Sequence, residues 1–181
     1  MLRKLALLFS ALGMAALVTH PLQGQIADPP ARQATMTSQE QDAVILARQG
    51  LMDGIYQYVE DADDWTEKSA APNDSAMLQA LTREAAHTAL MLPAFKQLFP
   101  PPTNPESAEF SSMFDTYALP AIWADPARFS ADLDATIAAI NVLSMARSRS
   151  EFTQRLESLQ ATCDACHDHF RRVYVSPLDP K

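Results

Sequence analysis

The only two cysteines of the 181-residue chain, Cys163 and Cys166, stand three positions apart near its end, and His167 follows directly. Thiols at this spacing can form a disulfide, exchange disulfides, bind a metal or carry a haem. Thiol exchange is typical of a β-α-β context, which the surrounding sequence lacks. A closed zinc site needs four protein ligands. After residue 25 there is no second cysteine pair, and only His87, His167 and His169 could complete such a site.

The pattern C-x-x-C-H is the attachment motif of haem c. Each thiol adds to a vinyl group of the haem, and the histidine becomes an axial ligand of the iron. On a helix, Cys163, Cys166 and His167 fall within about 100° of one another and so share one face. Phe170 and Tyr174 continue this face, which suits an apolar plate. We therefore predict one covalent haem c per chain, with a plain disulfide or chance spacing as the alternatives.

The first 25 residues predict the compartment. Arg3 and Lys4 precede an uncharged apolar stretch at positions 5–18, which is shorter than the ~20 residues needed to span a bilayer. This organisation is typical of a secretory signal peptide, with an uncleaved anchor as the alternative. We expect cleavage near Gly24 or Gln25 and a location in the periplasm.

The charge of the chain restricts its partners. The formal net charge is −8, and removal of the leader, which carries two basic and no acidic residues, lowers it to about −10. Binding to nucleic acid through phosphates requires basic patches, so we expect no nucleic-acid partner. The negative charge favours encounter with a basic protein.

Helical periodicity dominates the rest of the chain, which contains little glycine. The expected helices span about residues 37–60, 75–99, 126–147 and 150–175. Thr37 and Glu40 form a capping box at the first start, and the acidic residues 61–65 are expected to end that helix. Pro93 should kink or shorten the second helix. Asp125, followed by proline, is a typical start for the third.

Four helices of this length with short first and third loops predict an all-α, antiparallel four-helix bundle. The haem c would be attached near its C-terminus. The expected organisation is a signal peptide at 1–25, a flexible lead-in at 26–37, the bundle at 38–176 and a tail at 177–181.

Over about residues 38–175 the chain resembles the class II c-type cytochromes, the cytochrome c′ family. The resemblance is carried by CDACHDHFRR at 163–172, by ALPAIWADPARF at 118–129, by ARQGLM at 47–52 and by LFP at 98–100. The segment ALPAIWADPARF resembles the Pro-x-Ile-Trp segment that opens the family's third helix. The resemblance implies a four-helix bundle with one haem on its C-terminal C-x-x-C-H.

The first helix has an expected inward stripe centred on Met52, which is apolar apart from Arg48 and Gln49. Its apolar members are Ile45, Ile55, Tyr56 and Val59. A charge on a core-facing stripe is costly unless it is paired. Together with the resemblance, this favours a haem propionate as the partner of Arg48, because a guanidinium matches a carboxylate. The alternative is that Arg48 reaches solvent at the edge of the stripe.

The resemblance also implies a role for Met52, because the family's residue at this position faces the haem. Some members use a methionine there as a sixth iron ligand and carry electrons, whereas others leave the iron five-coordinate and bind NO or CO. A thioether can ligate iron and is equally a flexible core filler. Arg171 resembles the family's basic residue near the proximal histidine, with a cation at a helix C-terminus as the alternative.

These observations predict a periplasmic monohaem c-type cytochrome that transfers single electrons between redox partner proteins. A five-coordinate haem protein that binds NO or CO is the alternative. The haem-binding residues expected are Cys163, Cys166, His167, Arg48, Gln49, Met52, Phe170 and Arg171, with His167 and Met52 as candidate iron ligands. No poised acid–base pair is evident, so we expect no enzymatic activity. The resemblance implies a homodimer through the first two helices.

Overall fold

The computed structural model describes residues 35–68 and 74–173. The predicted signal peptide and tail, most of the lead-in and Tyr174 lie outside these ranges. The helices are α1 (Ser38–Glu67), α2 (Asp74–Phe95), η1 (Lys96–Leu98), η2 (Pro101–Thr103), α3 (Ala121–Ala124), α4 (Pro126–Ser144) and α5 (Arg149–Phe170). η1 and η2 are single 3₁₀ turns.

The helix α1 begins at the capping box expected from the sequence. The backbone N–H of Glu40 donates to the Thr37 hydroxyl at 3.2 Å, and the Glu40 carboxylate accepts from the Thr37 N–H at 2.7 Å. The predicted end near residue 60 is wrong, because the helix continues to Glu67. Ala62 and Trp65 are buried there, and this packing outweighs the weak helix preference of the acidic residues.

The helix α2 ends earlier than expected. It contains Pro93 and stops at Phe95, where the chain passes into η1, so the prediction of helix up to Phe99 is wrong. Proline lacks an N–H and crowds the preceding turn, and a 3₁₀ turn is a common way to finish such a helix.

The helices α4 and α5 begin as predicted and end early. Asp125 caps α4, with its carboxylate accepting from the Arg128 N–H at 3.0 Å. The helix ends at Ser144 rather than near residue 147, and α5 ends at Phe170 rather than near residue 175. Beyond Phe170 the chain is extended, and Arg171 pairs with Ala118 in an isolated antiparallel bridge. Pairing with the α2–α3 connection thus replaces the last helical turn.

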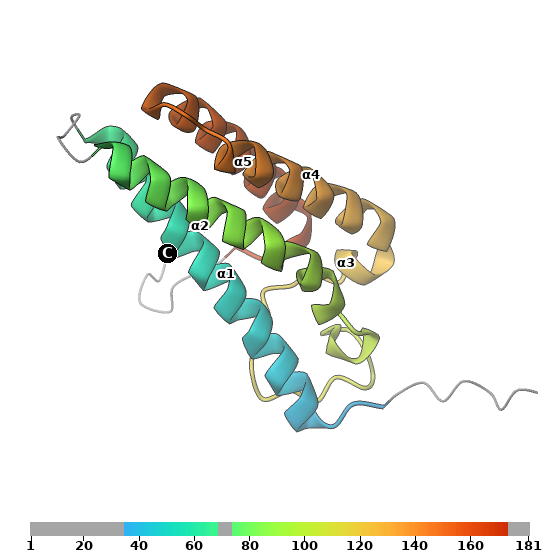
Figure 1. The fold of residues 1–181 in the computed structure, drawn as a ribbon. Coiled ribbons are helices and arrows are strands. Elements are labelled where there is room, and N and C mark those ends of the chain that lie inside the picture. Colours follow the sequence, from blue (N-terminus) through green and yellow to red (C-terminus); the bar gives the residue numbers. More distant parts are fainter. Residues whose placement is uncertain (1–34, 69–73, 174–181) are drawn as a thin grey trace, which may run out of the picture. The chain divides into compact units, whose positions relative to one another are not determined.

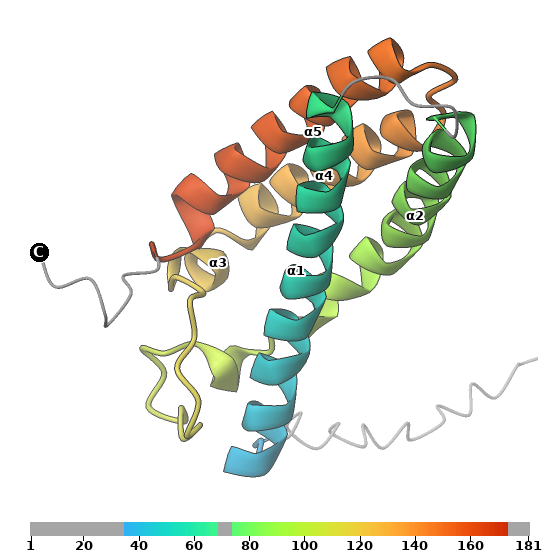
Figure 2. The ribbon, with the colours of Figure 1, turned by 90° about the vertical axis from the view of Figure 1, so that its left-hand side faces the viewer.

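The four long helices run alternately up and down (Figures 1 and 2). The closest packing joins α4 to α5 and to α2. Towards its N-terminus α1 diverges from α5, and the connection from η1 to α3 lies beside this half of α1 (Figure 2). Among the described residues, none of the helices is long and apolar enough to cross a membrane.

An ion pair between Arg149 and Asp74 stabilises the end of the bundle farthest from the cysteines. Arg149 of α5 donates to both carboxylate oxygens of Asp74 at 3.1 and 2.9 Å, and to the Trp65 carbonyl. Its guanidinium also lies 4.5 Å from the Trp65 ring centroid. Three helices are therefore fixed to one another at this end, whereas α1 is free to diverge at the other.

Candidate haem site

The cysteine pair lies in the last turns of α5, with both thiols half-buried against the hydrophobic core and not joined in a disulfide. Burial raises the pKa of Cys163 to about 11, with a smaller contribution from the Asp164 carboxylate. Burial also raises the pKa of Cys166 to about 11. Redox-active C-x-x-C pairs have a lowered thiol pKa, so these protonated thiols do not fit a thiol oxidoreductase.

His167 follows the pair and is also half-buried. Burial lowers the pKa of its imidazole and Arg171 lowers it further, while the carboxylates of Asp164 and Asp168 oppose the shift. An imidazole must be neutral to bind a metal. The environment of His167 therefore favours the form that can ligate iron.

Arg48 is the most unusual side chain of the site. It is 5% exposed, and none of its three guanidinium nitrogens has a hydrogen-bond partner. Burial lowers its pKa to about 10. The guanidinium lies 4.7 Å from the ring centroid of Phe99 and 5.9 Å from that of Trp123. An unpaired buried cation is costly, so the site fits a group that brings a carboxylate to Arg48.

The other residues that were expected to face inward on α1 do so only in part. Met52 is half-buried and packs on the same core as the two cysteines. The Gln49 amide donates to the Asp115 carbonyl at 3.0 Å, so it holds the α2–α3 connection. The expectation that Tyr56 faces inward is wrong, because it is 63% exposed. Tyr56 therefore lies outside the part of the stripe that the core covers, which includes the buried Ile45.

Two further predicted haem-binding residues lie at the end of α5. Phe170 is buried, with its ring centroid 5.4 Å from that of Phe129. Arg171 is exposed, and its backbone N–H donates to the His167 carbonyl at 3.0 Å. Arg171 therefore influences the pKa of His167 from the helix terminus.

Two further histidines of the described residues, His169 and His87, are exposed to solvent. His169 is exposed; its Nδ1–H donates to the Ala165 carbonyl at 2.8 Å, and its Nε2 accepts from Arg128 at 2.6 Å. His87 is exposed on α2, where its Nδ1 lies 3.7 Å from a Glu84 carboxylate oxygen.

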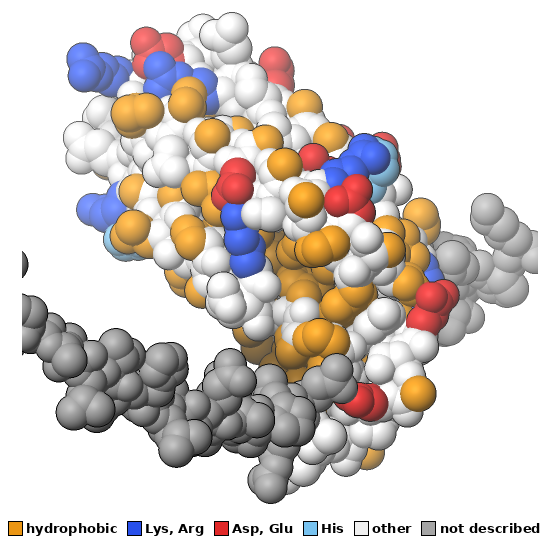
Figure 3. All heavy atoms as spheres, turned by 90° about the vertical axis from the view of Figure 1, so that its right-hand side faces the viewer, with side chains coloured by type: hydrophobic (Ala, Val, Ile, Leu, Met, Phe, Trp, Pro, Cys, Tyr) orange, Lys and Arg blue, Asp and Glu red, His pale blue; other side chains and the backbone are white. Residues whose placement is uncertain are grey.

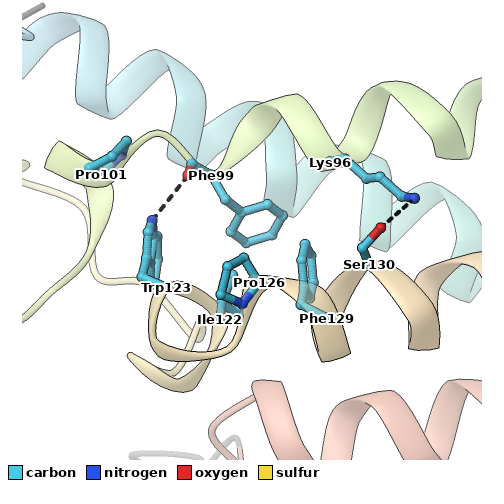
Figure 4. Close-up of a pocket in the computed structure, with 8 residues that line it drawn as sticks. All are labelled: Lys96, Phe99, Pro101, Ile122, Trp123, Pro126, Phe129 and Ser130. Atoms are coloured by element: carbon cyan, nitrogen blue, oxygen red, sulfur yellow. Dashed lines mark hydrogen bonds between the residues drawn. The ribbon is translucent and has the colours of Figure 1, made fainter.

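An apolar pocket of about 330 Å³ opens between the end of α2 and the start of α4. Phe99, Ile122, Trp123 and Phe129 form its walls, and the Trp123 indole N–H donates to the Phe99 carbonyl at 3.0 Å (Figure 4). Hydrophobic side chains gather in a hollow on this side of the molecule (Figure 3). The guanidinium of Arg48 also lies over the rings of Phe99 and Trp123, so two aromatic walls of the pocket neighbour that buried cation.

The sequence did not indicate that the residues of this pocket lie together. The signal that could have identified them is the aromatic content of two segments, LFP at 98–100 and ALPAIWADPARF at 118–129. Each is short and irregular, so periodicity could not place either relative to α1.

Comparison with known proteins decides the family. Residues 43–171 match the family model described as Cytochrome C′. The chain belongs to the cytochrome c′ family. Haem c is the covalently bound cofactor of this family, so the predicted family and cofactor are confirmed. No curated protein matches the chain significantly.

Solved cytochromes c′ have the same fold. The protein from Rhodobacter sphaeroides is 23% identical, with a TM-score of 0.61 over 74% of this chain and 98% of that one. The protein from Thermochromatium tepidum is 17% identical, with a TM-score of 0.62 over 77% and 100%. A cytochrome c′ described by its ligand-controlled dimer dissociation is 15% identical, with a TM-score of 0.62 over 74% and 97%. These likenesses confirm the predicted all-α four-helix bundle.

Proposed function

We propose that this cytochrome c′ is a periplasmic monohaem electron carrier, whose haem c supplies an iron that cycles between the ferric and ferrous states. Cys163 and Cys166 would hold the haem through thioether bonds, and His167 would be the proximal ligand. The two thiols and the imidazole share the last turns of α5, and helical spacing places them on one face.

The unpaired guanidinium of Arg48 is the observation that carries this proposal. A buried cation without a partner destabilises the fold, whereas a haem propionate would supply the missing carboxylate. An arginine fork can form two parallel hydrogen bonds with a carboxylate. Arg48 would therefore orient the haem, and its positive charge would favour the reduced iron.

The position of Met52 supports electron transfer rather than the binding of NO or CO. Its thioether is half-buried, one turn beyond Arg48 on α1, and borders the core that also contacts Cys163 and Cys166. A methionine on the other side of the iron from a histidine is an arrangement used by electron-carrying cytochromes, where it raises the reduction potential. We propose Met52 as the sixth ligand.

The location and partners follow from the leader and the charge. The signal peptide would export the chain to the periplasm, where haem c is attached. The acidic surface would favour basic redox partner proteins. We propose a carrier and not an enzyme, because the chain supplies ligation, burial and electrostatics to the cofactor.

A second candidate function is the binding of NO or CO by a five-coordinate haem. One structurally similar cytochrome c′ is described as undergoing ligand-controlled dimer dissociation, which motivates both gas binding and a homodimer here. Size-exclusion chromatography checks the dimer: elution as a monomer at micromolar concentration would exclude it.

Visible spectra of the reduced protein, with and without CO, distinguish the two functions. Electron transfer through a Met52-ligated iron predicts a sharp low-spin α band that CO leaves unchanged. Met52→Ala should convert this spectrum to a broad high-spin band that responds to CO, because alanine offers no ligand.

Met91, which is exposed on α2, provides a matched control. Met91→Ala should leave the spectrum unchanged. A broad band and CO binding in the unaltered protein would favour the gas-binding function, and an unchanged spectrum in Met52→Ala would exclude Met52 as a ligand.

A further inference from the structure

Residues 109–117 form a segment that we call the strap, which runs beside α1 from η2 towards α3 (Figure 2). Two of its apolar side chains are exposed, Met113 at 81% and Phe114 at 38%, whereas Phe110 is half-buried. Segments with few buried apolar contacts open more readily than the core. The position of the strap therefore depends in large part on polar contacts.

Gln41 anchors the strap from inside the protein. The side chain is 0% exposed, and both ends of its amide bind the strap backbone. Its Nε2 donates to the Glu109 carbonyl at 2.8 Å, and its Oε1 accepts from the Ser111 N–H at 2.8 Å. A buried glutamine that is satisfied in this way fixes backbone position, because leaving its groups unpaired is costly.

Asp42 and Gln49 extend this anchorage along α1. One carboxylate oxygen of Asp42 accepts from the Ser112 hydroxyl at 2.5 Å and from the Met113 N–H at 3.0 Å. Hydrogen bonds to an ionised acceptor are the stronger kind. The Gln49 amide then holds the Asp115 carbonyl, next to the buried Arg48.

The other end of the strap is fixed to the residues that follow α5. The Arg172 guanidinium donates to the Asp115 carboxylate at 3.0 Å, and the Arg172 N–H donates to the Tyr117 carbonyl at 2.7 Å. The Leu119 N–H donates to the Phe170 carbonyl at 2.9 Å. The strap therefore joins α1, which carries Arg48, to the end of the helix that carries the cysteines.

We propose that the strap controls the access of small molecules to the haem iron, with Gln41 and Asp42 as positioning residues that hold it closed. This inference rests on the proposed haem site and is independent of whether Met52 ligates the iron. Opening of the strap requires loss of the hydrogen bonds to Gln41 and Asp42, so weakening these bonds should raise the fraction of time for which the site is open.

The test measures CO association with the ferrous holoprotein by stopped flow, in a Met52→Ala background so that the sixth position is free. Asp42→Ala should raise the association rate about tenfold, because it removes two charge-assisted hydrogen bonds. Asp42→Asn keeps an accepting oxygen and should stay within about twofold of the parent. Gln41→Met keeps the length of the buried side chain and should also raise the rate.

Gln57→Ala is the matched control, because this exposed glutamine of α1 contacts only Asp61, at 3.4 Å, among the hydrogen bonds of the described residues. Amide hydrogen exchange at Ser111 and Met113 reports on the strap itself. Faster exchange together with faster CO association in Asp42→Ala supports the proposal. Unchanged exchange, an unchanged CO rate, or an equal effect of Gln57→Ala would overturn it. If instead the proposed haem site were wrong, the protein would lack haem absorbance altogether, so this result can be told apart from failure of the strap proposal.

Discussion

Replacement of both Cys163 and Cys166 by alanine is expected to abolish covalent haem. The unaltered protein should keep its haem colour in the protein fraction after denaturation and extraction with acidified organic solvent. The double variant should lose essentially all of it, because thioether bonds survive unfolding whereas iron ligation does not. Absorbance of the extracted protein measures this directly.

His169→Ala is the control for this experiment, since His169 lies on the same helical segment and is exposed. It should retain full covalent haem. The attachment site is wrong if the double cysteine variant keeps extraction-resistant haem, or if His169→Ala loses as much haem as the double variant.

Arg48→Met is expected to have opposite effects on the apoprotein and the holoprotein. The apoprotein should gain about 1–2 kcal/mol in free energy of unfolding, because an unpaired buried cation is removed and only its contacts with Phe99 and Trp123 are lost. The holoprotein should show a reduction potential lower by on the order of 50 mV, because a positive charge near the haem is lost. Denaturant titration and redox titration measure the two effects.

The apoprotein for this comparison is the Cys163→Ala, Cys166→Ala variant, with and without Arg48→Met. Arg83→Met provides the control, because Arg83 is exposed on α2, and it should change neither quantity appreciably. A loss of apoprotein stability in Arg48→Met would show that Arg48 is already stabilised without haem. An unchanged potential would exclude the propionate as its partner.

The sequence was sufficient to predict the bundle and the haem c cofactor. Apolar periodicity, the capping box at Thr37 and the Asp125–Pro126 start are local signals, and the structure contains each of them. The haem motif is also local, since its three residues lie within five positions. Helix ends were less predictable, because α1 is prolonged by packing of Trp65 and α5 is ended by pairing with Ala118.

The strap could not be predicted, because its hydrogen bonds join residues far apart in the sequence. Gln41 and Ser111 are separated by 70 positions, and Asp42 and Met113 by 71. Periodicity identifies the face on which a polar residue lies but not the backbone that it binds. For the same reason the sequence could not show that the Gln49 amide donates to the Asp115 carbonyl.

Peptide mass mapping of the exported protein, purified from cells able to attach haem c, is the most direct test of the haem assignment. We expect a single C-terminal peptide that contains both Cys163 and Cys166 and carries the added mass of one haem, with neither thiol open to alkylation. A colourless protein whose two thiols react with an alkylating reagent, or are bonded to each other, would contradict the assignment.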